Sequence, residues 1–182
     1  MCCEEWELLK KLKTQVEGRI LWYVCCHPDY PNTFIGSPLV ESQLIGYFTA
    51  YTGLNGFLRW NYTVWPERPR ERLSYKYPNW KSGDTNFVYP GYDGKPLLSI
   101  RYKNLKRGIE AFELIQILKR VAPNAQEVLE KVWNLIFRTR RVEDFHPQSG
   151  KEPRSLYSLD YQDYQNARQI LLEEIEKSLE NR

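Results

Sequence analysis

The sequence lacks the long apolar run that a membrane-spanning helix needs, and it lacks a recognisable secretory signal. A membrane span takes about 18 or more consecutive apolar residues, and no such run occurs among the 182 residues. The first residues, MCCEEWELLKKLKTQ, do not show the basic segment and apolar core of a signal peptide. We therefore expect no membrane partner, and the length is that of one domain.

Cysteine is scarce, and its spacing does not suit a metal site. The four cysteines form two adjacent pairs, Cys2-Cys3 and Cys25-Cys26. Zinc sites typically use CxxC spacing, and neighbouring side chains on a strand point to opposite faces. We therefore predict free thiols, no metal ion and no cofactor. Free thiols favour a reducing compartment such as the cytoplasm.

The sequence also lacks an excess of charge of one sign. Lysine and arginine number 26 against 23 acidic residues, a net charge of +3, and the two signs are mixed along the chain. One alternative is that Arg68, Arg70 and Arg72 line a groove for single-stranded nucleic acid. Because glutamates alternate with these arginines and the net charge is low, we expect no nucleic-acid partner.

Aromatic residues are abundant, with six Trp, thirteen Tyr and seven Phe. They gather in GFLRWNYTVW, residues 56–65, and continue through residues 63–96, where five prolines break every regular period. A stretch of this length is either functional or disordered, and its aromatic content argues against disorder. We predict an ordered loop of the kind that forms active sites, with a short strand near 86–89.

Helical and strand-like segments alternate along the chain. The run ILWYVCC is continuously apolar, which is typical of a strand covered on both faces, as in a parallel sheet. Alternation of strands with helices is the signature of βα units. We predict an α/β fold with about three parallel strands, at 20–26, 56–62 and 97–100, and with helices at 4–16, 39–51, 101–121, about 124–140 and about 161–180.

The candidate ligand-binding residues lie at the carboxyl end of the predicted strand 56–62 and in the loop after it. Parallel α/β folds bind ligands at this end of the strands. Trp60, Tyr62 and Trp65 offer ring faces that can cover the apolar face of a sugar, and Asp84 and Tyr89 offer polar groups for its hydroxyls. Packing in the core is the alternative for the aromatic residues, and a turn-forming role is the alternative for Asp84.

Several motifs, taken in order, resemble the catalytic region of glycoside hydrolase family 123 and a related bacterial domain of unknown function. These are WYVCCHPDYPN, ES-LIGYFTAYTGLNGFLRW, GD-FVYPG and SIR-L-GIEAFELI, and they span roughly residues 20–120. The resemblance implies a (β/α)8 barrel that removes terminal N-acetyl-β-galactosamine by substrate assistance. In that chemistry the 2-acetamido oxygen is the nucleophile, one carboxylate orients it, and an adjacent glutamic acid protonates the leaving oxygen.

The chain departs from this pattern because it contains no Asp-Glu dipeptide, which the resemblance gives as the catalytic pair. Its adjacent acids are Glu4-Glu5, Glu143-Asp144 and Glu173-Glu174, and only Glu143-Asp144 lies outside a charged helix. The catalytic residues are therefore unknown, and we predict an isolated chain that binds a sugar without cleaving it. We also expect Arg101 to pair with Glu41 or another carboxylate.

The length predicts a partial (β/α)8-type barrel, because a complete one takes about 250 residues. We divide the single domain into residues 1–121, which form the partial barrel, and residues 122–182, which form a C-terminal helical tail packed on it. Open strand edges invite pairing with another chain. The alternative is therefore one half of a split or self-associating hydrolase, completed by a second copy or by an upstream barrel portion.

Overall fold

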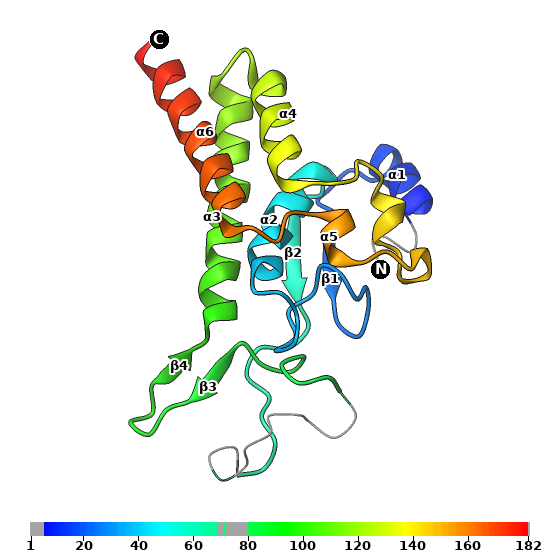
Figure 1. The fold of residues 1–182 in the computed structure, drawn as a ribbon, viewed down its shortest axis with the longest axis vertical. Helices are drawn as coiled ribbons and strands as arrows, with labels where there is room; N and C mark the ends of the chain where they lie inside the picture. The colour runs from blue at the N-terminus through cyan, green and yellow to red at the C-terminus, as the bar shows by residue number, and fades with distance from the viewer. Residues whose placement is uncertain (1–5, 69–70, 72–79, 182) are drawn as a thin grey trace.

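The computed structural model describes residues 6–68, 71 and 80–181 as a mixed α/β fold (Figure 1). Cys2, Cys3, Glu4, Glu5, Arg70 and Arg72 lie outside the described residues. The elements are α1 (Trp6–Gln15), β1 (Leu21–Val24), α2 (Val40–Tyr51), β2 (Gly56–Arg59), β3 (Val88–Pro90), β4 (Pro96–Leu98), α3 (Ile100–Val121), α4 (Ala125–Ile136), η1 (Val142–Phe145), η2 (Pro147–Ser149), α5 (Pro153–Leu156) and α6 (Tyr161–Glu180). Across the described ranges, no helix has the length and apolar character to cross a membrane.

Strands β1 and β2 form a two-stranded parallel sheet with α2 as its crossover, as the alternation of elements predicts. Trp22 lies opposite Phe57, and the Trp22 ring also contacts Phe48 of α2 with ring centroids 5.3 Å apart. Side chains alternate across a strand, so Leu21 and Leu58 point to the other face, where they are 56% and 48% exposed. The sheet is therefore covered by α2 on one face and is largely open on the other.

The prediction of a third parallel strand at 97–100 is wrong. Strand β4 instead pairs antiparallel with β3, close to the short strand predicted at 86–89, and Tyr89 lies opposite Leu97. A tight turn joins the two strands: the Gly91 amide donates to the Lys95 carbonyl (3.1 Å), and Gly94 has a φ of +77°. The local Asp-Gly turn favours a hairpin. This turn makes the apolar run LLSI pair antiparallel with β3. By composition alone the run resembles a buried parallel strand.

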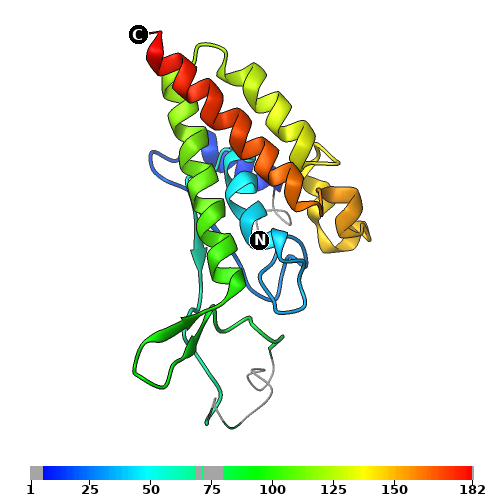
Figure 2. The ribbon, with the colours of Figure 1, turned by 60° about the vertical axis from the view of Figure 1, so that its left-hand side comes forward.

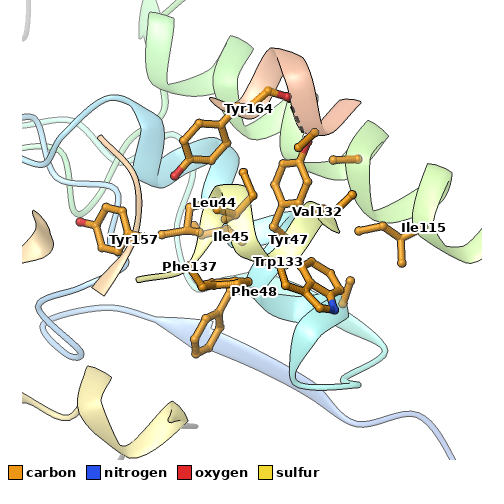
Figure 3. Close-up of a cluster of buried hydrophobic side chains, with 14 of the residues drawn as sticks. Leu44, Ile45, Tyr47, Phe48, Ile115, Val132, Trp133, Phe137, Tyr157 and Tyr164 are labelled. Carbon is orange, nitrogen blue, oxygen red and sulfur yellow. Dashed lines mark hydrogen bonds between the residues drawn. The ribbon is translucent and has the colours of Figure 1, made fainter. Parts of the chain in front are cut away.

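Helix α2 forms the centre of the core and is buried along nearly its whole length. Figure 3 shows its side chains among those of α3, α4 and α6, with the Tyr47 and Tyr164 rings 5.8 Å apart. Phe48 contacts Phe145 of η1 with ring centroids 4.9 Å apart. The helical spacing of Leu44, Phe48 and Tyr51 in the sequence predicts a single apolar stripe on this helix. In the structure α2 is instead buried on all sides, because helices α3, α4 and α6 pack on the side that the sheet leaves free.

Helices α3, α4 and α6 lie side by side in both views (Figures 1 and 2) and carry the C-terminal part of the chain. Helix α4 ends at Ile136, four residues before the predicted end at 140. There the chain becomes extended, because Phe137 pairs with Tyr157 in an isolated bridge and the Arg138 amide donates to the Leu156 carbonyl (2.9 Å).

Helices α2 and α3 touch backbone to backbone at two glycines. A Cβ atom built on Gly46 would lie 1.8 Å from the Gly108 carbonyl oxygen, and one built on Gly108 would lie 2.6 Å from the Gln43 carbonyl oxygen. Neither position has room for a side chain. The helices pack this closely only because both residues lack one.

We expect Gly46→Ala to lower the free energy of unfolding by about 3 kcal/mol or more, because the added methyl group must push the two helix backbones apart. Urea denaturation measures this change. Gly36→Ala is the matched control, because a Cβ at Gly36 has no atom within 4 Å, and it should change the stability by less than about 0.5 kcal/mol. Equal losses in both variants would contradict the close-packing explanation.

Candidate functional site

A buried ion pair stands at the carboxyl end of β2. The Arg59 Nη2 atom lies 2.9 Å from Asp84 Oδ1, and the two side chains are only 4% and 1% exposed. Arg59 Nη1 also donates to the Val24 carbonyl at the end of β1 (2.8 Å), and Nη2 donates to the Asp84 carbonyl. Burial lowers the pKa of Arg59, and the Asp84 carboxylate opposes that shift. One guanidinium thus joins both parallel strands to the loop that carries Asp84.

Trp60 and Asp84 meet beside this ion pair. The indole Nε1 of Trp60 donates to Asp84 Oδ1 (3.3 Å), and the Trp60 ring packs edge-on against Trp80 with centroids 5.4 Å apart. Trp60 is 36% exposed, whereas Asp84 Oδ2 is buried with no hydrogen-bond partner within the described ranges. We call Arg59, Trp60, Trp80 and Asp84 the Trp60–Asp84 site. It combines a partly exposed ring face with a buried carboxylate that holds the Trp60 indole and the Arg59 guanidinium.

Arg101, at the start of α3, holds the backbone around the site. Its guanidinium donates to the carbonyls of Thr33 (2.5 Å), Gly83 (2.9 Å) and Asn86 (2.8 Å). The expectation that Arg101 pairs with Glu41 or another carboxylate is therefore wrong. A buried guanidinium needs several acceptors, and here loop carbonyls supply them, so Arg101 fixes two loops against one helix.

Phe87 lies between the two buried arginines. The guanidinium carbons of Arg59 and Arg101 lie 5.5 and 5.3 Å from its ring centroid, within the range of cation–π contacts. Tyr62 stacks on the same ring, with centroids 5.6 Å apart and an interplanar angle of 25°. These contacts order the chain on either side of Asp84 without regular secondary structure.

Of the five predicted site residues, the structure brings Trp60 and Asp84 together. Tyr62 lies on Phe87, the Trp65 indole donates to the Val88 carbonyl (2.8 Å), and Tyr89 lies in the β3–β4 hairpin. Arg59 and Trp80 were not predicted. A signal for Arg59 exists in the sequence, because a charged residue within a half-buried strand needs a partner, and Asp84 is an acid in the following loop.

A polar cavity of about 400 Å³ borders the same loop, and its lining includes Asp29, Tyr30, Phe34, Lys81 and Ser82. Lys81 Nζ lies 2.9 Å from the Asp29 carboxylate and 4.9 Å from the Phe34 ring centroid. Lys81 follows Trp80 directly in the chain. The cavity therefore offers charged and aromatic groups next to the Trp60–Asp84 site.

Glu41 links the first turn of α2 to the C-terminal part of the chain. The carboxylate is fully buried, accepts from the Asn32 amide (2.7 Å) and accepts from the Tyr157 hydroxyl. Burial raises the pKa of Glu41 to about 7, while the hydrogen bonds from Tyr157 and Asn32 oppose that shift. Glu41 therefore titrates near neutral pH within the framework that carries the site.

Glu143 and Asp144, the adjacent acids outside the charged helices, lie in η1. Asp144 accepts from Lys151 Nζ (2.6 Å) and from the Thr139 hydroxyl (2.5 Å), and these bonds lower its pKa. Glu143 lies 3.9 Å from Lys10 Nζ. Each acid has a lysine as partner, an arrangement typical of structural ion pairs. Cys25 and Cys26 are free thiols, and the described part of the chain contains no cluster of metal-binding side chains.

Comparison with known proteins places this arrangement in a family. The model of the glycoside hydrolase 123 catalytic domain matches residues 3–118, more than half of the chain. The chain therefore belongs to glycoside hydrolase family 123. A similar solved structure is that of a family 123 glycoside hydrolase from Clostridium perfringens, whose structural analysis concerns glycolipid glycan hydrolysis. It is 27% identical, with a TM-score of 0.55 over 87% of this chain and 26% of that chain.

The chain spans about a quarter of the length of that solved enzyme. No curated protein matches the chain. The match therefore identifies the family of this chain but does not establish its activity.

We expect the stability to fall as the pH rises from about 4.5 to about 7, and then to level off. The raised pKa of Glu41 means that the folded protein binds the proton more tightly than the unfolded chain, so this stabilisation is complete below pH 4.5 and is lost through pH 7. The loss amounts to about 3 kcal/mol for this one group. Urea denaturation at pH 5 and pH 8 measures it.

Glu41→Gln should abolish this component, because glutamine does not ionise and its carbonyl oxygen still accepts a hydrogen bond. Glu176→Gln, at an exposed position of α6, is the control and should leave the pH dependence unchanged. An identical pH profile for wild type and Glu41→Gln would show that Glu41 is not the group responsible.

Proposed function

We propose that this chain forms one wall of a carbohydrate-binding site of glycoside-hydrolase type and that the isolated chain does not cleave the glycosidic bond. The observation that carries the proposal is the contact between Trp60 and Asp84 at the carboxyl end of β2. Family membership supports a glycan as the ligand. The resemblance described above favours an N-acetylhexosamine.

The chemistry of the Trp60–Asp84 site suits such a ligand. The half-exposed Trp60 ring can cover the apolar C–H face of a pyranose. Asp84 is buried and accepts from the Trp60 indole N–H, so it fixes the ring that would face the ligand. We assign Tyr62, Trp65 and Tyr89 as flanking substrate-binding residues. Burial and the neighbouring Tyr102 raise the pKa of Tyr62 to about 12, so its hydroxyl stays protonated at neutral pH.

The lack of activity follows from the missing acids. Substrate-assisted hydrolysis, as the resemblance implies it, needs one carboxylate to orient the acetamido group and a second to protonate the leaving oxygen. The sequence has no Asp-Glu dipeptide, and Asp144 of the Glu143-Asp144 pair is held by Lys151 and Thr139. A surface that binds the sugar without these acids does not stabilise the transition state.

The parallel unit β1–α2–β2 fits a segment of a (β/α)8 barrel, and we propose that residues 1–121 are such a partial barrel. Residues 122–182 would then be a helical tail of the same domain. Contacts between α6 and α3 support packing of this tail on the partial barrel.

A second candidate is that the chain is part of a split or self-associating hydrolase. The open face of the β1–β2 sheet and the exposed Leu21 and Leu58 favour it. A chain that spans about a quarter of a solved family member also favours it. The missing portion would come from a second copy or from an upstream barrel portion.

We expect N-acetylgalactosamine to bind the purified chain and Trp60→Ala to weaken this binding about tenfold, a loss of about 1.4 kcal/mol. The loss would come from the ring face that covers the sugar. Isothermal titration calorimetry measures the affinity. Tyr161→Ala is the matched control, because Tyr161 on α6 is 37% exposed, almost the same as Trp60. Equal affinities of wild type and Trp60→Ala would place the sugar elsewhere.

We expect no release of nitrophenol from nitrophenyl N-acetyl-β-galactosaminide by the isolated chain, because the sequence has no Asp-Glu dipeptide. The measurement is absorbance against an enzyme-free blank. Turnover above the blank that Glu143→Gln removes would overturn the proposal of an inactive chain, whether or not the sugar binds at Trp60.

A further inference from the structure

An apolar groove runs between α2, β2 and α3. Its volume is about 490 Å³, and it is lined by Ile45, Gly46, Thr49, Asn55, Gly56, Phe57, Arg59, Tyr62, Leu105, Ile109, Phe112 and Glu113. Ile109 is 54% exposed there. In the described ranges β2 pairs only with β1, and β1 does not line the groove. The groove therefore adjoins an edge strand, which is a ready surface for strand pairing.

One end of the α2–β2–α3 groove is polar. An adjoining cavity of about 320 Å³ shares Asn55, Phe112 and Glu113 with it and adds Arg19 and Lys119, among others. Burial lowers the pKa of Lys119 and the neighbouring Lys13 lowers it further, so this corner is crowded with positive charge. A segment that fills both cavities would need an apolar part followed by charged groups.

The β3–β4 hairpin of the same chain has this composition. All three residues of β4 are exposed, and Leu97, Leu98 and Ile100 are 55%, 51% and 61% exposed. Among the described residues β4 pairs only with β3. The turn at the tip carries Asp93 and Lys95, whose side chains are 65% and 84% exposed.

The hairpin does not fill the groove of its own chain. Both ribbon views show it projecting away from the helices (Figures 1 and 2). Only Ser99 separates β4 from α3, and its hydroxyl accepts from the Tyr102 amide (3.1 Å) at the helix N-terminus. With a connection this short, the hairpin is held at the end of α3, whereas the groove lies along it at Ile109 and Phe112.

We propose that two copies of this chain associate by reciprocal exchange, the β3–β4 hairpin of each lying in the α2–β2–α3 groove of the other. Leu97, on the face of the hairpin opposite the buried Val88, would cover Ile109 and Phe112 and remove exposed apolar surface on both sides. At the tip, Lys95 would meet Glu113, and Asp93 would meet Arg19 and Lys119.

The two contacts would be equivalent by a twofold axis, so the assembly would close at two copies. The inference gives the self-associating form of the proposed function a defined interface. It does not depend on sugar binding at Trp60, so each can fail without the other.

Light scattering after size-exclusion chromatography of the full chain tests the proposal. The expected mass is twice the 21.8 kDa of one chain. Ile109→Asp in the groove and the double change Leu97→Asp/Leu98→Asp in the hairpin should each give monomers. An equimolar mixture of these two variants should regain dimers, because one intact hairpin then meets one intact groove. The mixed dimer keeps only one of the two contacts, so it should dissociate at a higher protein concentration than the wild-type dimer.

Leu179→Asp is the control, since Leu179 is 52% exposed on α6, and it should remain dimeric. Circular dichroism melting of each variant checks that the positions, all exposed, tolerate aspartate. Lys95→Glu and Glu113→Lys should each weaken the dimer, and the two changes together in one chain should restore it. A wild-type monomer would overturn the proposal and leave the groove for another chain. A dimer that survives both the groove and the hairpin variants would overturn it as well.

Discussion

The close contact between Gly46 and Gly108 is the constraint on which the rest of the structure depends. It brings the backbones of α2 and α3 together and leaves α2 surrounded by the sheet, the helical tail and the loops. A helix buried on every side must find partners for its polar groups. Glu41 finds them in Asn32 and Tyr157, and by doing so it ties the loop after β1 to the C-terminal part of the chain.

The same requirement for partners fixes the described residues around Asp84, which have almost no regular structure. Arg59 and Arg101 are both buried, and each meets its need for acceptors with carbonyl groups of the loops. Asp84 is then fixed by Arg59 on one oxygen, while its other oxygen has no partner in the described residues. A site whose side chains are already held in place would lose little further conformational entropy on binding a ligand.

Much of the fold follows from local sequence signals, and the exceptions have physical causes. The helices at α1, α2, α3 and α6 and the strands β1 and β2 follow from apolar period and alternation. The pairing of residues 97–100 does not, because composition shows that a run can be a strand but not which strand it meets. Likewise, Arg101 and Glu41 are visible as charges near element ends, but their partners are set by tertiary packing. Trp60 and Asp84 lie together at a strand end and the loop that follows it. The contacts of Arg59 with Asp84 and the Val24 carbonyl are evident only from the structure.

The two ways of completing this chain differ in the chemistry that they allow. A second copy brings no residue type that the first copy lacks, and neither copy contains an Asp-Glu dipeptide. The proposed self-association through the hairpin would therefore multiply the proposed sugar-binding walls, and it would raise avidity without adding catalysis. The acids that substrate assistance requires would have to come from outside these 182 residues. Under these proposals, the occupant of the α2–β2–α3 groove would decide the function: the hairpin of a second copy would leave a binding protein, and a barrel portion with the missing acids would complete an enzyme.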